Sequence, residues 1–333
     1  MSAESTEERA KRTERLFKGD GVGYPDGVPL PEPPPWRHPS GKRARTRYLI
    51  RQEQIDVVNA ALRLRRPLLV TGRPGTGKST LAHAIAGELG LGPVLTWPVN
   101  TRSTLDGALY RYDAIGRLRD QQGAGRAGGK EAKVGHDTDS DIGTYIRLGA
   151  LGTALATEYR GRPRMLLIDE FDKSDVDLPN DLLFVLEEGE FQIPELARLP
   201  EDRRTVQVNT ADWEERVTVH GGTVRCSEFP FVLITSNGER EFPPAFLRRC
   251  VRLELPYPDE EQLEKIVRAH FTSDHDWDRV RELIRGFVEQ RKLGDLATDQ
   301  LLHAVHLLRQ GVEPEQRHLK EAVLRELRDT GPG

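Results

Sequence analysis

The chain has 333 residues, of which 37% are hydrophobic and 31% are charged, and its formal net charge is -4. These values predict one large domain with a smaller companion and disfavour a general attraction to nucleic acid. No apolar run reaches the ~20 residues of a membrane helix, and the charged start lacks an apolar signal segment, so we expect a cytoplasmic protein without a membrane partner. Only two cysteines, Cys226 and Cys250, occur, which excludes a disulfide framework and a multi-cysteine zinc site.

Residues 1–45 are rich in proline and charge, as in "PDGVPLPEPPPWRHPSGKRAR". Proline removes a backbone donor, and the charged residues offer little to bury, so we expect a disordered arm. Its basic end could contact nucleic acid or a neighbouring subunit, although a solvated tail is the simpler interpretation. The basic residues are Arg37, Lys42, Arg43, Arg45 and Arg47.

After the arm, strand and helix patterns alternate along the chain. A helix is predicted within "RYLIRQEQIDVVNAALRLRR", where apolar positions repeat at helical spacing until Pro67 ends it. Apolar runs predict strands before residue 72 and at 93–99, 164–170, 229–237 and 251–255. Helical patterns lie between them at 79–89, 149–159 and 178–188. This alternation predicts an α/β fold with a parallel sheet covered by helices on both faces.

Two further segments differ from this alternation. Residues 116–143 contain seven glycines and almost no apolar anchors, so we expect a flexible excursion. From Asp259 onward the periodicity is helical throughout, which predicts a small all-helical domain. Its helices are expected near 259–271, 278–291, 298–310 and 315–329.

The stretch "LLVTGRPGTGKSTLA" (68–82) predicts a phosphate-binding loop between a strand and a helix. Its glycines permit a tight loop whose N–H groups turn inward, and the positive end of the next helix faces that loop. Lys78 would reach the β- and γ-phosphates of a nucleotide, and the Ser79 hydroxyl would bind Mg²⁺. The predicted phosphate-binding residues are Gly72, Arg73, Pro74, Gly75, Thr76, Gly77, Lys78, Ser79 and Thr80.

Polar residues at later strand ends would complete such a site. In "MLLIDE", Asp169 would hold Mg²⁺ directly or through water, and Glu170 would orient the attacking water. The strand "FVLITSN" ends in Asn237, whose amide could contact the γ-phosphate or the water, or could simply be a turn residue. Arg248 and Arg249 in "AFLRRC" precede the last strand and could form a finger aimed at a neighbour's nucleotide, or a solvated patch.

In this order the motifs resemble those of an AAA+ ATPase, most closely the MoxR branch. The matching stretches are "GRPGTGKST" as Walker A, "LLIDEFDKS" as Walker B, "ITSN" as sensor 1 and "AFLRRC" as the arginine-finger segment. The resemblance implies a P-loop α/β domain over 46–256 and a helical lid over 257–333. It also implies a helix-2 insertion at about 107–148 and a hairpin before sensor 1 at about 216–230. The Gly221-Gly222 pair predicts that hairpin by itself.

The resemblance further implies Mg²⁺-dependent ATP hydrolysis by a homo-oligomeric ring, expected to be hexameric, that remodels or activates a partner protein. Such partners are often von Willebrand factor A-type proteins or components of conflict systems. Arg249 matches the finger position best, with Arg248 as its neighbour. Where the family places a sensor 2 arginine, this chain has Thr298, Asp299 and Gln300.

Two other functions fit the same core. A nucleic-acid-dependent motor or restriction-type translocase is disfavoured by the net charge of -4 and by the lack of a recognisable DNA-binding module. An ATP-binding switch that regulates an effector without steady turnover is the second alternative.

Overall fold

The computed structural model describes residues 31, 33–34, 48–126, 142–212, 216–271, 277–293 and 296–310. The chain divides into two units, Met1–Ala44 and Arg45–Gly333, and every element below belongs to the second. Most of the predicted arm and the helix predicted at 315–329 lie outside the described residues. No helix in the described ranges is long and apolar enough to cross a membrane.

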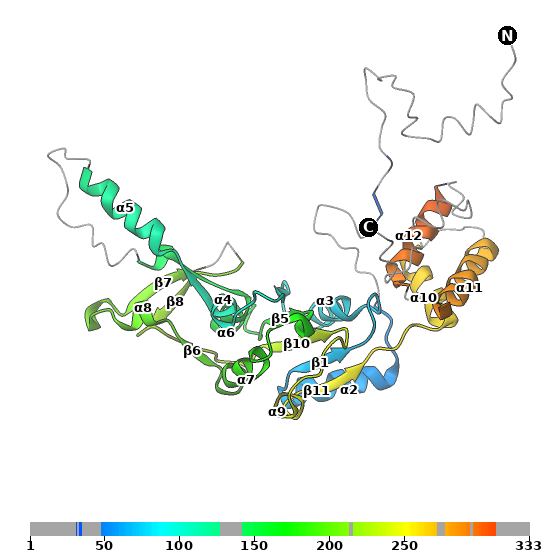
Figure 1. The fold of residues 1–333 in the computed structure, drawn as a ribbon, viewed down its shortest axis with the longest axis horizontal. Coiled ribbons are helices and arrows are strands. Elements are labelled where there is room, and N and C mark those ends of the chain that lie inside the picture. The colour runs from blue at the N-terminus through cyan, green and yellow to red at the C-terminus, as the bar shows by residue number, and fades with distance from the viewer. Residues whose placement is uncertain are drawn as a thin grey trace, which may run out of the picture. The chain divides into compact units, whose positions relative to one another are not determined.

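Five parallel strands form sheet A in the order β11-β1-β10-β5-β2. They are β1 (Leu68–Thr71), β2 (Leu95–Pro98), β5 (Met165–Asp169), β10 (Phe231–Ser236) and β11 (Val251–Glu254). Because the strands are parallel, their carboxyl ends meet at one edge, where Thr71 lies opposite Ser236 and Asp169 ends the neighbouring strand. The predicted parallel sheet is confirmed, and it brings the polar strand ends together (Figure 1).

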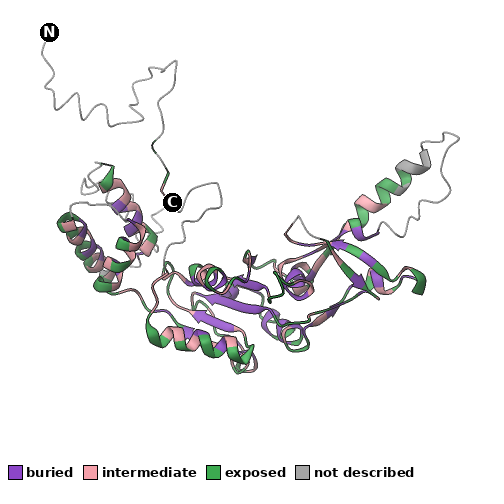
Figure 2. Cartoon of the chain, turned by 180° about the vertical axis from the view of Figure 1, so that it is seen from behind, coloured by how far each residue is buried: buried purple, intermediate pink, exposed green. Residues whose placement is uncertain are grey.

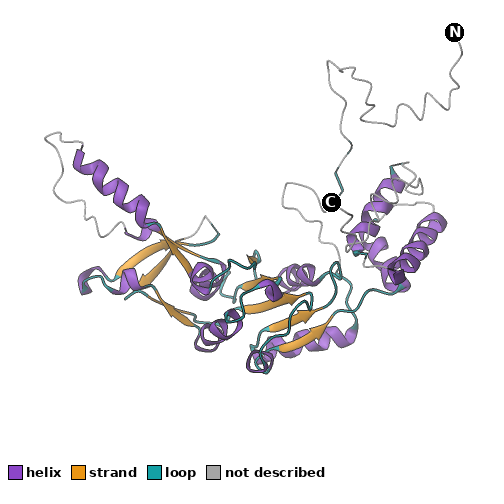
Figure 3. Ribbon diagram, in the orientation of Figure 1, coloured by secondary structure: helices purple, strands orange, loops and turns teal. Residues whose placement is uncertain are grey.

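Alternate side chains of sheet A enter two separate cores. Leu68 and Val70 of β1 pack into one core, whereas Leu69 packs into the other. Both faces are therefore apolar and covered, which explains the near-continuous apolar runs of these strands. Figure 2 shows buried residues throughout the strands, and Figure 3 shows helices beside them. The flanking helices are α2 (Gln52–Leu64), α3 (Lys78–Leu89), α6 (Ala150–Ala156), α7 (Leu178–Glu188) and α9 (Pro244–Leu247).

The segment expected to be a flexible excursion, 116–143, is helical at its start. Helix α5 (Ala114–Arg126) begins where the Asp113 carboxylate accepts the backbone N–H of Gly116 at 2.8 Å. This cap supplies a local hydrogen bond at the helix start that does not depend on apolar burial. For residues 116–126 the expected flexible excursion is therefore corrected to a helix, and residues 127–141 lie outside the described ranges.

Six short strands form a second sheet, sheet B, in the order β3-β4-β7-β8-β9-β6. They are β3 (Tyr110–Tyr112), β4 (Ile146–Leu148), β6 (Glu190–Gln192), β7 (Thr205–Asn209), β8 (Arg216–His220) and β9 (Thr223–Arg225). A two-residue turn, Gly221-Gly222, joins β8 to β9 with both φ angles positive. The short helices α4 (Leu105–Leu109) and α8 (Pro194–Ala197) border the sheet. The two segments singled out around 107–148 and 216–230 therefore join one sheet.

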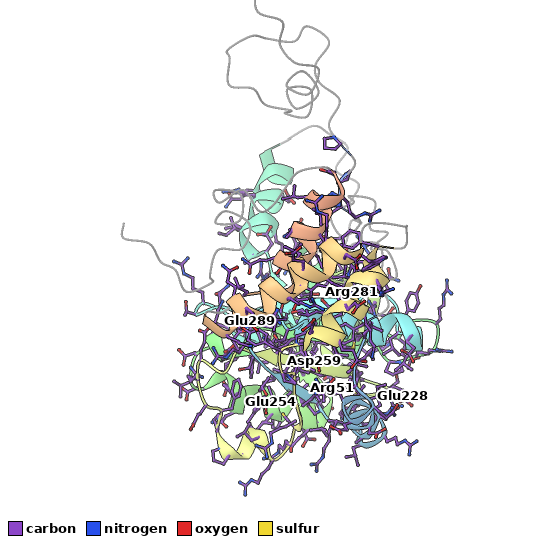
Figure 4. The ribbon with its side chains drawn as sticks, turned by 90° about the vertical axis from the view of Figure 1, so that its right-hand side faces the viewer. Arg51, Glu228, Glu254, Asp259, Arg281 and Glu289 are labelled. Atoms are coloured by element: carbon purple, nitrogen blue, oxygen red, sulfur yellow. The ribbon has the colours of Figure 1, made fainter. Side chains whose placement is uncertain are left out.

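Three amphipathic helices follow sheet A, namely α10 (Glu260–His270), α11 (Trp277–Leu293) and α12 (Thr298–Arg309). Asp259 begins α10, where its carboxylate accepts the N–H of Gln262 at 2.9 Å. The same carboxylate pairs with Arg51, the residue before α2, at 2.7 Å (Figure 4). This exposed pair joins residues 208 positions apart, so it connects the helical segment to the start of the α/β part.

Candidate active site

The glycine-rich loop follows β1 directly and ends at α3. Gly75 and Gly77 have φ angles of +74° and +90°, in the left-handed region that favours glycine. A Cβ on Gly75 would lie 2.3 Å from the Cβ of Ala297, and a Cβ on Gly77 would lie 3.2 Å from the Tyr48 ring. Both the backbone angles and the close neighbours therefore require glycine in this loop.

Lys78 is the first residue of α3, and its side chain turns back into the loop. Its Nζ donates hydrogen bonds to the carbonyl oxygens of Gly72, at 2.7 Å, and Arg73, at 2.9 Å. Burial lowers the pKa of this ammonium, while the nearby carboxylates, chiefly Asp172 and then Asp169, oppose the shift. The loop thus holds a buried cation beside its own backbone, which is a suitable counter-charge for phosphate.

Asp169, at the end of β5, brings together residues of three elements. Its Oδ1 accepts hydrogen bonds from the hydroxyls of Ser79, at 2.7 Å, and Thr235, at 2.6 Å. The Thr235 hydroxyl in turn accepts the backbone N–H of Glu170 at 2.8 Å. A carboxylate beside a serine hydroxyl is the hard-oxygen donor set that Mg²⁺ prefers, so these residues fit the metal that the motifs imply.

Glu170 follows β5 and turns away from the strand direction with φ +59°. Its Oε2 pairs with Nζ of Lys173 at 2.8 Å, and both side chains are partly exposed. The pair raises the pKa of Lys173. The carboxylate predicted to orient water is therefore held by a lysine three residues further along the chain.

Asn237 directly follows β10, and its position depends on Asp172. One Asp172 oxygen, Oδ2, accepts the backbone N–H groups of Asn237, at 2.8 Å, and Glu239, at 3.1 Å. Among the described residues the other oxygen has no hydrogen-bond partner, although the side chain is buried. The Asp172 carboxylate therefore holds the turn after β10.

The structure does not bring Arg248 and Arg249 to the glycine loop of their own chain. Both lie between α9 and β11, at the start of a parallel strand, whereas the loop follows the end of β1. Arg249 pairs with Glu187 on α7 and donates to the carbonyl oxygen of Ala245 at 3.3 Å. Arg248 and Arg249 therefore lie at the opposite end of the parallel strands from the glycine loop.

Four residues near the loop were not singled out for this role by the sequence: Tyr48, Leu255, Ala297 and Thr298. The backbone N–H of Thr298 donates to the carbonyl oxygen of Gly75 at 3.3 Å, so α12 begins against the loop. Arg291 donates to the Thr298 hydroxyl at 3.3 Å, and burial of the Arg291 guanidinium lowers its pKa to about 10. No local pattern indicates the contacts of Leu255, Ala297 and Thr298 with the loop, because each joins residues far apart in sequence.

Residues 67–250 match the family model of the AAA domain of the dynein-related subfamily. The matched range covers more than half of the chain and contains the glycine loop, Asp169, Asn237 and both arginines. The chain belongs to the AAA+ family. A comparison with curated proteins gives no match. Membership in this family accounts for the parallel sheet and the loop geometry and indicates a nucleotide-binding, ATP-dependent protein.

Proposed function

We propose that this AAA+ protein hydrolyses ATP with the help of Mg²⁺ and uses the reaction to remodel or activate a partner protein. The observation that carries the proposal is the hydrogen-bonded group of Ser79, Asp169 and Thr235 beside the buried Lys78. It combines a cation for phosphate with oxygen ligands for a metal at the carboxyl edge of a parallel sheet, where such folds bind nucleotides.

Each residue then has a role that follows from its position. Lys78 would exchange the carbonyl oxygens of Gly72 and Arg73 for phosphate oxygens, with little movement of its buried stem. Ser79 and Asp169 would hold Mg²⁺, which when bound neutralises charge on the phosphate oxygens. Loop N–H groups at the start of α3 would bind the remaining phosphate charge.

Glu170 and Asn237 would position the attacking water from two neighbouring strand ends. Glu170 must leave Lys173 to do so, and an exposed ion pair of this kind contributes only about 0.2–1 kcal/mol, so release is easy. Catalysis of phosphoryl transfer relies mainly on positioning and charge neutralisation, which is what this arrangement provides.

We infer a homo-oligomeric ring, expected to be hexameric, because Arg248 and Arg249 lie between α9 and β11, away from the glycine loop of their own chain. AAA+ proteins usually assemble in rings. Arg249 is assigned as the finger, with Arg248 as the alternative. In the single subunit Glu187 holds Arg249, so assembly would replace that carboxylate with a neighbour's phosphate.

We assign the chain to the MoxR branch on the order of its motifs and on the strands around 107–148 and 216–230. The partner would then be a von Willebrand factor A-type or conflict-system protein. A DNA-dependent motor is the alternative, motivated by the basic run at residues 37–47. Under our proposal ATP turnover is unchanged by DNA; DNA-stimulated turnover that survives deletion of residues 1–45 would favour the motor.

Two substitutions separate nucleotide binding from hydrolysis. Lys78→Ala removes the buried counter-charge and should abolish ATP binding, whereas Glu170→Gln should keep binding and lower kcat at least ~100-fold. Isothermal titration with ATP and a phosphate-release assay measure the two properties. Lys265→Ala, which removes an exposed lysine of α10, is the control and should behave like the wild type. Undiminished hydrolysis by Glu170→Gln would remove that residue from the mechanism.

A further inference from the structure

The hydroxyl of Thr235 interrupts an apolar row at the end of β10. Phe231 and Leu233, at alternate positions before it, point into the core that α3 also lines. Thr235 follows them on the same face, because the side chains of a strand alternate, and Val70, directly opposite on β1, belongs to the same core. Thr235 is only 1% exposed. A valine would continue this row without a buried polar atom, so the hydroxyl requires an explanation.

Two neighbouring groups determine where the single proton of this hydroxyl points. The backbone N–H of Glu170 donates to the Thr235 oxygen at 2.8 Å, and an N–H group cannot accept a hydrogen bond. The hydroxyl proton is therefore directed at Asp169, whose Oδ1 lies 2.6 Å away. Asp169 lies at this level because Ile234 and Ile168, the preceding residues of the two strands, are paired. The Thr235 hydroxyl thus connects the end of β5 with the backbone that follows it.

The same Asp169 oxygen also accepts the hydroxyl of Ser79, at 2.7 Å. With two hydroxyl protons directed at Oδ1, the carboxylate cannot rotate without breaking both hydrogen bonds. Because a carboxylate is planar, its second oxygen, Oδ2, is held as well. The Ser79 hydroxyl gives its proton to Asp169, so its oxygen can offer a lone pair to a cation. Thr235 therefore helps to hold both residues that the proposed function assigns to Mg²⁺.

We infer that Thr235 is a positioning residue that orients the Asp169 carboxylate for Mg²⁺ and so sets how much Mg²⁺ the protein needs to bind ATP tightly. The inference rests on the proposed function, to which it adds a residue that acts through Asp169 rather than on the nucleotide. A group that hydrogen-bonds to a metal ligand fixes the orientation of that ligand, and its loss typically weakens metal binding about ten- to hundredfold.

A purely structural role is the alternative, and another buried threonine provides the comparison. Thr153 of α6 is 0% exposed, and its hydroxyl accepts the backbone N–H of Ala211 at 2.9 Å. Both hydroxyls therefore satisfy one backbone N–H, and the Thr235 hydroxyl in addition donates to a carboxylate. If the Thr235 hydroxyl only maintained the fold, removing either hydroxyl would have the same effect on nucleotide binding.

The test compares Thr235→Val, Thr235→Ser and Thr153→Val with the wild type. Valine keeps the branched shape and removes the hydroxyl, whereas serine keeps the hydroxyl. A fluorescent, non-hydrolysable ATP analogue is titrated in EDTA, and then at fixed concentration with increasing Mg²⁺. Thr235→Val should raise the half-saturating Mg²⁺ concentration about ten- to hundredfold and keep the affinity in EDTA within about twofold. Thr235→Ser should return to within about threefold of the wild type, and Thr153→Val should match it.

Thermal unfolding is measured on each variant, because Thr235→Val and Thr153→Val each leave one N–H group without its acceptor. Thr235→Cys, whose thiol is a weaker donor and acceptor, should need an intermediate Mg²⁺ concentration, and it replaces Thr235→Val if that variant does not fold. An unchanged Mg²⁺ requirement in the folded variant, or an equal rise in Thr153→Val, overturns the inference. Binding of the analogue by the wild type that does not respond to Mg²⁺ also overturns it.

These titrations need no ATP turnover, so the inference and the proposed hydrolysis can fail separately. Turnover by the wild type together with an unshifted Thr235→Val removes only the positioning role. A shifted Mg²⁺ requirement in Thr235→Val without turnover by the wild type removes only the hydrolysis. If the wild type does not bind the analogue at all, both proposals are overturned.

Discussion

Asp172 connects the two strand ends that carry the predicted catalytic residues. It lies two residues after Glu170, is only 5% exposed, and accepts the N–H groups of Asn237 and Glu239 through one oxygen. Arg240 strengthens the same connection by donating to the carbonyl oxygens of Ser174 and Asp175. The backbone position of Asn237 is therefore set by the segment after β5 as well as by β10 itself.

Asp172→Ala should separate turnover from nucleotide binding. It leaves two backbone N–H groups without an acceptor, at about 1–3 kcal/mol each, so we expect a stability loss of about 2–4 kcal/mol. We also expect kcat to fall at least tenfold (~1.4 kcal/mol) while ATP affinity changes less than about threefold, because the loop keeps its contacts. Denaturant unfolding and steady-state ATPase assays, made below the melting temperature, measure these quantities.

Asp172→Asn is the informative companion, since its amide oxygen can still accept both N–H groups. It should retain most of the stability and an intermediate kcat. Unchanged kcat in a folded Asp172→Ala protein would contradict the positioning role of this carboxylate.

At the scale of elements, the β8–β9 hairpin shows how local and tertiary demands differ at adjacent residues. Gly221 and Gly222 both have positive φ angles, +60° and +71°. A Cβ on Gly221 would meet nothing within 4 Å, whereas a Cβ on Gly222 would lie 2.4 Å from the backbone nitrogen of Ala197 in α8. The positive φ angles require a residue that tolerates left-handed backbone at both Gly221 and Gly222. The packing of the turn against α8 requires glycine only at Gly222.

Gly221→Asn and Gly222→Asn form a matched pair that tests this packing. Asparagine tolerates left-handed backbone angles, so Gly221→Asn should cost less than about 1 kcal/mol. Gly222→Asn must also displace Ala197, the last residue of α8, and should cost about 2–4 kcal/mol. Chemical unfolding gives both values, and equal losses would show that the contact with α8 is not maintained in solution.

At the scale of the whole molecule, the proposed ring predicts that Arg249 completes the site of a neighbouring subunit. Arg249 is linked to the predicted site through aromatic packing. The Phe246 ring, three residues before Arg249, packs on the Phe171 ring, with centroids 5.5 Å apart. Phe171 directly follows Glu170. The segment before Arg249, the proposed finger, thus packs against the segment after Glu170, the proposed water-orienting residue, while the Arg249 guanidinium pairs with Glu187.

Mixing two inactive variants tests whether Arg249 acts on the neighbouring subunit. Arg249→Ala and Glu170→Gln should each lack ATPase activity. In a randomly mixed ring about a quarter of the interfaces would combine an intact Glu170 with an intact Arg249, so activity should reappear. A phosphate-release assay on mixed and unmixed samples measures it, with fluorescence exchange as proof of mixing.

If subunits exchange and the mixture stays inactive, the finger is not Arg249. The same experiment with Arg248→Ala is the control: activity regained only there would assign the role to the neighbouring arginine.

The local sequence pattern was sufficient to predict sheet A and the glycine-rich loop of this protein. The strand–loop–helix order around Gly72–Ser79, the apolar runs of sheet A and the acids after β5 each depend on neighbours in sequence, so their periodicity and spacing predicted an α/β P-loop fold, which the structure confirms. The contact between Ser79 and Asp169 follows from that fold, because parallel strands end at one edge. The catalytic roles of these residues stay predictions.

Tertiary structure alone decided three other features. In the sequence Asp172 is one of several acids after β5. Only the folded chain shows that its buried carboxylate accepts a backbone N–H of the turn after β10. Tyr48 and Ala297 lie against the glycine loop from distant parts of the chain. Sheet B joins strands from two separate segments, and only its register aligns Arg111, Arg147 and Arg216. Each feature depends on contacts between residues far apart in sequence, which composition and periodicity do not encode, because they report only what a residue's near neighbours favour.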